Sequence, residues 1–132
     1  MLIEFNTKKT VNEAADALRE AVAANHFGVM QVHDLKESMA QKGVNFAREC
    51  LIFEVCQPQQ AKLVLEHNIS VSAVLPSRIS VYEKNGRTVL AAVRPTTLLA
   101  MIRSPELESV AEDVENTIFE IMREAAKARF DL

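Results

Sequence analysis

The dipeptide Asn85-Gly86 constrains the fold of this chain most, because it predicts a tight β-hairpin. A type I′ turn needs positive φ at both central residues, and Asn followed by Gly is the pair that adopts this most readily. The flanking segments 78–83 and 88–93 are rich in strand-forming residues. We therefore expect an antiparallel pair of strands, and a sheet built around it.

Capping signals predict where three helices begin. Thr10 and Glu13 form a capping box, in which each side chain accepts from the other residue's backbone amide. Asp34 is expected to cap a second, short helix, and Pro58 suits the first position of a third. Apolar residues then recur at helical spacing. They are Val11, Ala14, Ala15, Leu18 and Val22 in the first helix, Leu35 and Met39 in the second, and Ala61, Val64 and Leu65 in the third.

The remaining elements follow from alternation and spacing. Strands are expected at 2–5, 29–33 and 50–56, a short helix at 98–102, and a long helix beginning at Ser104-Pro105 with the serine as its cap. The resulting order is β-α-β-α-β-α-β-β-α-α within a single domain, residues 1–132. This order predicts an α+β, or mixed α/β, fold: a two-layer sandwich with helices packed on a mixed β-sheet.

Charge and hydropathy narrow the classes of function. The formal net charge is −3, and Lys and Arg are scattered with no run longer than two, so no nucleic-acid partner is expected. No apolar run reaches the ~18 residues that span a bilayer, so no membrane association is expected. The first residues lack the basic start and apolar stretch of a signal peptide. These observations favour a cytoplasmic protein.

The two cysteines, Cys50 and Cys56, lie on one predicted strand. Six residues of strand separate them by roughly 20 Å, whereas a disulfide needs Cα atoms within about 7 Å, so an intrachain bridge is not expected. Cys56 precedes the helix that begins at Pro58, and a helix N-terminus stabilises a thiolate. Cys56 is therefore the candidate catalytic or sulfur-carrying residue. The competing interpretation is a small buried hydrophobic residue.

Ser77, Arg78 and Arg94 are the other candidate ligand-binding residues. Ser77 and Arg78 stand where a loop enters a strand, and the guanidinium could clamp a carboxylate or phosphate through two hydrogen bonds. Pairing of Arg78 with Glu54 or Glu83 remains the alternative. Ser77 has no evident histidine partner, which disfavours a serine hydrolase.

No cofactor or metal is expected from the sequence. The three histidines are isolated, and no two lie at a metal-ligand spacing. His33-Asp34 is a weak acid–base candidate, because adjacent strand residues face opposite ways and Asp34 is needed as a cap. The three glycines form no phosphate-binding loop, which disfavours nucleotide-binding folds of the P-loop or dinucleotide type.

Several sequence blocks resemble the family called domain of unknown function 302. They are Gly28-Val29, His33-Asp34-Leu35-Lys36, Lys42-Gly43-Val44, Phe53-Glu54-Val55-Cys56-Gln57-Pro58 with Ala61, Leu75-Pro76-Ser77-Arg78-Ile79-Ser80-Val81-Tyr82-Glu83, and Pro95-Thr96. The resemblance implies a small two-layer α/β domain, dimeric in some members, with no established activity. The family usually has Cys in Leu-Pro-Cys-Arg, where this chain has Ser77, although Cys56 of its Cys-x-Pro is kept. That departure weakens a two-cysteine redox or metal site.

These observations lead to a first hypothesis and its rivals. The first is a non-enzymatic homodimeric module that binds a small anionic ligand or a partner protein, with Arg78 and Arg94 flanking the hairpin strands. The second is a thiol-dependent sulfur-carrier or redox protein centred on Cys56. The third is an interaction scaffold with an exposed apolar patch. The sequence leaves open whether the protein is an enzyme.

Overall fold

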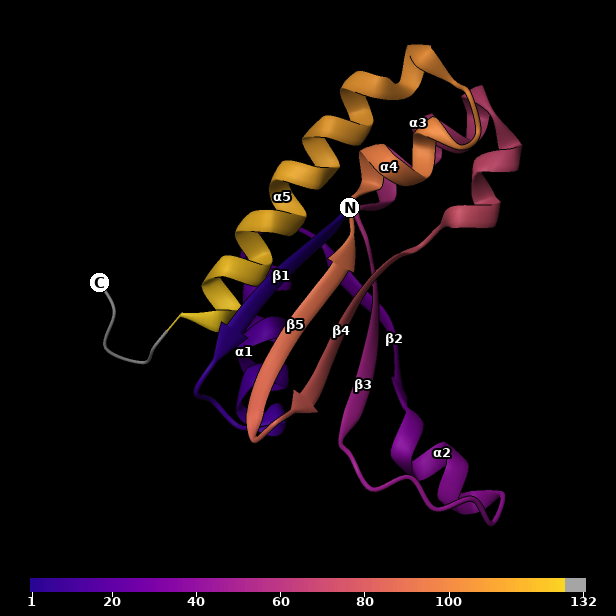
Figure 1. Ribbon diagram of the computed structural model, residues 1–132. Coiled ribbons are helices and arrows are strands. Elements are labelled where there is room, and N and C mark those ends of the chain that lie inside the picture. The colour runs from indigo at the N-terminus through magenta and orange to yellow at the C-terminus, as the bar shows by residue number, and fades with distance from the viewer. Residues whose placement is uncertain (128–132) are drawn as a thin grey trace.

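The hairpin at Asn85-Gly86 joins two strands inside a five-stranded sheet of order β1-β5-β4-β3-β2 (Figure 1). The computed structural model describes residues 1–127. The strands are β1 (Leu2–Thr7), β2 (Gly28–Asp34), β3 (Cys50–Cys56), β4 (Ser77–Lys84) and β5 (Arg87–Val93). The helices are α1 (Val11–Ala24), α2 (Leu35–Gln41), α3 (Pro58–His67), α4 (Pro95–Ala100) and α5 (Glu108–Ala126), with 3₁₀ turns η1 (Ile69–Val74) and η2 (Pro105–Leu107). The expected α+β sandwich is confirmed.

The sheet differs from the prediction in one respect, because it is antiparallel throughout rather than mixed. The helices α2 and α3 lie in the connections at the strand ends, so each following strand returns beside its predecessor in the opposite direction. The only connection that crosses the whole sheet is α1. It joins β1 and β2, which run in the same direction but occupy opposite edges and never pair.

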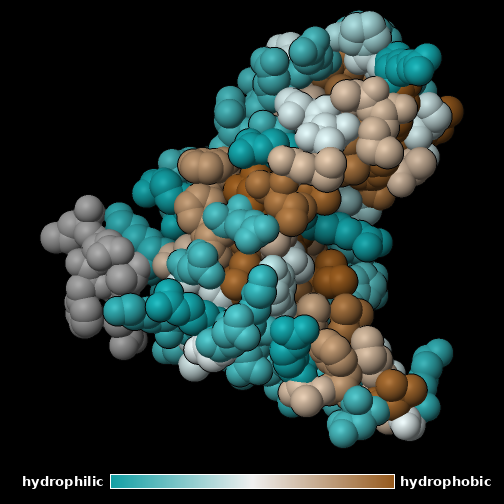
Figure 2. All heavy atoms as spheres, in the orientation of Figure 1, coloured by the Kyte–Doolittle hydropathy of each residue, from teal (hydrophilic) through white to brown (hydrophobic). Residues whose placement is uncertain are grey.

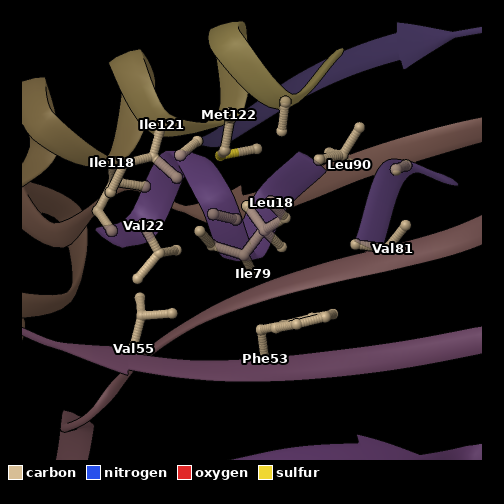
Figure 3. Close-up of a cluster of buried hydrophobic side chains, with 14 of the residues drawn as sticks. Leu18, Val22, Phe53, Val55, Ile79, Val81, Leu90, Ile118, Ile121 and Met122 are labelled. Atoms are coloured by element: carbon tan, nitrogen blue, oxygen red, sulfur yellow. The ribbon is translucent and has the colours of Figure 1, made fainter. Parts of the chain in front are cut away.

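The main core lies between one face of the sheet and the helices α1 and α5 (Figure 3). The expected stripe on α1 is confirmed, and all five of its residues are buried. Side chains from two helices and three strands meet in Figure 3: Leu18 and Val22 of α1, Ile118, Ile121 and Met122 of α5, and Phe53, Val55, Ile79, Val81 and Leu90 of β3, β4 and β5. This burial holds both helices on the same face.

A second, smaller cluster closes the end of the sheet where β4 begins and β5 ends. Its buried residues are Val71, Leu99, Leu107 and Ala111, which come from η1, α4, η2 and α5. Val64, Val74, Leu75 and Ile102 pack against them and stay partly exposed. This cluster has few fully buried side chains, and hollows remain around it.

Local details follow the predicted signals with three exceptions. Asn85 and Gly86 have φ of 53° and 76°, as a type I′ turn requires. Ser104 is not a helix cap, because its hydroxyl accepts from the Asn68 side chain at 2.7 Å and α5 begins after η2. The helix expected at 98–102 begins earlier, at Pro95, which suits a first helical position. The helix α2 buries none of its residues, so Leu35 and Met39 are only half-buried.

The opposite face of the sheet, hereafter the open face, is covered by no helix within residues 1–127. Figure 1 views this face, with α1 behind the sheet. By strand alternation and register it carries Leu2, Glu4 and Asn6 of β1, Val89, Ala91 and Val93 of β5, Arg78, Ser80 and Tyr82 of β4, Cys50, Ile52 and Glu54 of β3, and Gln31 and His33 of β2.

We predict that Phe53→Ala lowers the free energy of unfolding by about 3–5 kcal/mol, because it leaves a cavity in a solvent-free core. Urea unfolding followed by circular dichroism measures this loss. Ile69→Ala is the control, since that side chain is 72% exposed and its removal should change stability by less than about 0.5 kcal/mol. Equal losses for the two variants would contradict the assignment of Phe53 to the core.

Candidate functional site

Three hollows meet at the segment that leads into β4. The first, here called the Arg78 cleft, is lined by Ala73, Val74, Leu75, Pro76, Ser77, Arg78, Val93 and Leu98, and its volume is about 260 Å³. The second, the apolar cavity, lies among α3, η1, α4 and α5 with a volume of about 60 Å³. The third, the Cys56 cavity, has a volume of about 50 Å³ and lies between the sheet end, α3 and α5. Leu75 and Ser77 line all three.

The guanidinium of Arg78 lies at the Arg78 cleft and is largely solvent-accessible, with 66% of its side chain exposed. Its Nη2 is 3.8 Å from Oε2 of Glu54, which is an ion pair too long for a hydrogen bond. The other oxygen of Glu54 is 3.2 Å from Nε2 of His33. Within residues 1–127 the Arg78 side chain donates no hydrogen bond, so its five N–H groups can serve a ligand.

Cys56 and Ser77 are brought together with a third polar residue that the sequence analysis missed. Both line the Cys56 cavity, and so does Gln60 of α3. The Oε1 atom of Gln60 is buried and has no hydrogen-bond partner among the described residues. The sequence offered one signal for Gln60: it stands four residues before Val64 on α3, and that spacing places both side chains on the same face of the helix. The cavity therefore contains an acceptor with unused capacity.

Burial sets the acidity of the two thiols. It raises the pKa of Cys56 above its ordinary value. Burial is also the largest influence on Cys50, whose pKa is raised despite the opposing charge of Arg48. A raised pKa means less thiolate at neutral pH. The position of Cys56 before α3 therefore does not produce an acidic thiol. Both cysteines are free.

Arg94 lies apart from the Arg78 cleft and takes part in a different network. Its Nη1 is 3.4 Å from Oε2 of Glu115 on α5. The other oxygen of Glu115 accepts from the backbone N–H of Thr96 at 3.2 Å and from its hydroxyl at 2.6 Å. These contacts tie the start of α4 to α5. The structure therefore gives Arg94 a supporting contact and does not bring it to the other candidate residues.

Residues 1–127 hold neither a metal-binding cluster nor a helix that could span a membrane. No group of three or more His, Cys, Asp or Glu side chains in that range could hold a metal ion. No helix there has the length and apolar content needed to cross a membrane.

Comparison with known proteins supports the resemblance seen in the sequence. The model of the family Domain of unknown function DUF302 matches residues 3–125. The crystal structure of an uncharacterized conserved protein DUF302 from Bacillus stearothermophilus has a similar fold, with a TM-score of 0.88 and 30% sequence identity. That similarity covers 96% of this chain and 98% of the other. The search of curated proteins gave no match. The block Leu75 to Arg78, which carries much of the resemblance, lines the Arg78 cleft.

We predict that Glu115→Gln destabilises the fold by about 1–2 kcal/mol at neutral pH, because it weakens charge-assisted hydrogen bonds from Thr96 and Arg94. Burial raises the pKa of Glu115, but the hydrogen bonds from Thr96 and the charge of Arg94 together outweigh it, so the pKa is lowered. A lowered pKa stabilises the folded state above the pKa of an unfolded glutamate, about 4.3. This stabilisation is lost as the pH falls through that value toward the folded pKa.

Thermal unfolding at several pH values measures both effects. The difference between the wild type and Glu115→Gln should shrink as the pH drops below about 4.3. Glu120→Gln is the matched control, since Glu120 pairs with Arg123 on the same helix but in an exposed position, where an ion pair contributes little. A pH-independent difference for Glu115→Gln would contradict the role assigned to its charge.

Proposed function

This chain belongs to the DUF302 family, and from that premise we propose that it is a non-enzymatic homodimeric module that binds a small anionic ligand. The observation that carries the proposal is the open face of the sheet, which presents apolar side chains and has the Arg78 cleft at one end. A second copy of the chain would cover the face, and the anion would bind Arg78. We also propose a cytoplasmic location, which suits two free cysteines.

The composition of the open face supports an association between two copies. Tyr82 pairs with Val89 across β4 and β5, and Ser80 lies between Ile52 and Ala91 in the register of β3, β4 and β5. Val89 and Ala91 are already buried within the chain, whereas Ile52 and Tyr82 are half-buried. Figure 2 shows apolar side chains on this face among polar ones. Leu2 and Val93 extend the apolar surface to the next strand and are 48% and 37% exposed. Exposed apolar side chains on a sheet face that no helix covers suit an interface.

The arm formed by α2 and residues 42–49 gives a second argument for a dimer. Figure 1 shows α2 projecting beyond the end of β2 and β3. None of its residues is buried, and Val44 in the following loop is 54% exposed. An amphipathic segment that buries so little within its own chain is stabilised when another surface covers it. A second copy on the open face lies beside this arm and can supply that surface.

The Arg78 side chain supports the binding of an anion. Its guanidinium is exposed, and its single ion pair, with Glu54, leaves its hydrogen-bond donors unused within residues 1–127. A planar guanidinium binds a carboxylate or phosphate through two parallel hydrogen bonds. The anion would therefore lie against Arg78 at the mouth of the cleft.

The surroundings of the Cys56 thiol and the Ser77 hydroxyl bear on the thiol-dependent alternative. In the part of the chain that the structure describes, neither the Cys56 thiol nor the Ser77 hydroxyl makes a hydrogen bond. A nucleophile of either kind needs an adjacent base or a lowered pKa, and burial raises the pKa of Cys56. The thiol-dependent alternative therefore ranks second. For the open face, the alternative to a second copy of the chain is a partner protein.

We predict that the protein is a dimer at micromolar concentration and that Ile52→Lys dissociates it. The lysine would place a charge on the open face, between His33 and Ser80 in the register, where a second copy would desolvate it. Light scattering coupled to size exclusion measures the mass. Leu63→Lys is the matched control, since Leu63 is a 54% exposed residue of α3, and it should leave the dimer intact. A monomeric wild type would refute the dimer.

We predict that Cys56 is alkylated slowly in the native protein, because burial raises its pKa and limits access. Intact-mass measurement of iodoacetamide labelling against pH, on a Cys50→Ser background, gives the rate and the apparent pKa of Cys56. The rate should still be rising at about pH 8.5, the ordinary pKa of a free thiol, and should increase greatly on unfolding. Fast labelling at pH 7 in the folded state would instead favour the sulfur-carrier or redox alternative.

A further inference from the structure

We infer that the anion bound at Arg78 is a medium-chain carboxylic acid, whose unbranched tail lies in the Arg78 cleft and reaches toward the apolar cavity. This inference rests on the proposed function and specifies its ligand. The carboxylate would pair with the guanidinium, and the tail would contact the apolar residues that line the rest of the cleft.

The walls of the cleft favour an apolar tail over a purely polar anion. Apart from Ser77 and Arg78, every residue that lines it is apolar: Ala73, Val74, Leu75, Pro76, Val93 and Leu98. Inorganic phosphate at Arg78 would leave these side chains in contact with water. A ligand with an apolar tail removes from water the apolar part of the lining, which is somewhat more than half of its exposed surface.

The size of the hollows sets the length of the tail. An apolar cavity of about 150 Å³ holds benzene, with its six carbons, and the Arg78 cleft measures about 260 Å³. By that scale the cleft has room for roughly ten carbons, head group included. The apolar cavity adjoins the cleft, because Val74, Leu75, Ser77 and Leu98 line both hollows. The tail therefore points from Arg78 toward the second cluster.

The charges around the mouth of the cleft favour a carboxylate head. Arg78 is the only charged residue that lines the described cleft. Glu54 is the charged group nearest to the guanidinium, at 3.8 Å, and its side chain is 16% exposed and also contacts His33. Glu54 therefore only partly offsets the charge of the guanidinium, and the exposed N–H groups of Arg78 remain accessible to an anion in the cleft.

Isothermal titration calorimetry on the full chain with acetate, butanoate, hexanoate and octanoate tests the inference. The affinity should rise with chain length by up to about fourfold for each methylene, which is the effect of burying one CH₂. Octyltrimethylammonium, with a tail one carbon longer and the opposite charge, should bind at least about tenfold more weakly than octanoate.

Three variants locate the head and the tail. Arg78→Gln should lower the affinity for octanoate by about tenfold, which is the effect of losing a charge-assisted contact. Arg87→Gln, which changes an exposed arginine at the other end of β5, should leave binding unchanged. Leu98→Phe narrows the cleft where it adjoins the apolar cavity, so it should weaken octanoate binding while leaving butanoate binding unaffected. Thermal unfolding of each variant checks that it folds.

The outcomes separate this inference from the proposed function. If acetate and octanoate bind with equal affinity and Arg78→Gln abolishes the binding of both, the anion site at Arg78 stands and the proposed contact of an apolar tail with the cleft is wrong. Equal binding of octanoate and octyltrimethylammonium would overturn the carboxylate head. If none of these anions binds, and inorganic phosphate also fails to bind, both the inference and the anion-binding function are wrong.

Discussion

The packing of α1 and α5 against a single face of an antiparallel sheet is the constraint on which the rest of this structure depends. Phe53, Ile79 and Leu90 from the three central strands bury their side chains against these helices, so neither helix can move to the other face. Because both long helices pack on the other face, no helix within residues 1–127 covers the open face. The open face is therefore a consequence of the core and is the surface on which a second copy can add stability.

The end of the sheet is built differently, and this difference creates the hollows. There the chain uses short elements, η1, α4 and η2, whose second cluster contains few fully buried residues. Short helices with irregular connections fill space less completely than two long helices on a sheet. The segment Leu75-Pro76-Ser77 runs through this loosely packed region and borders all three hollows. Arg78 follows directly, so a single charged side chain stands beside mostly apolar walls.

The sequence predicted those features that depend on neighbouring residues and missed those that depend on distant pairings. The turn at Asn85-Gly86 and the cap at Thr10 each need only a few adjacent residues, and both are confirmed. The purely antiparallel sheet depends on how α2 and α3 turn the chain, which no local pattern encodes. The contact between Arg94 and Glu115 joins residues 21 positions apart, and Ser104 binds Asn68 across 36. Such contacts arise only when the second cluster assembles.

The two proposed binding events share a residue, and this links them energetically. Val93 belongs to the open face by its register with Leu2, and it also lines the Arg78 cleft. A tail that covers Val93 changes the apolar surface offered to a second copy, and a second copy changes the entrance to the cleft. Thermodynamic linkage requires that each event alter the affinity of the other by the same factor. A shared side chain at the end of an uncovered sheet would thus couple the proposed ligand binding to the proposed assembly.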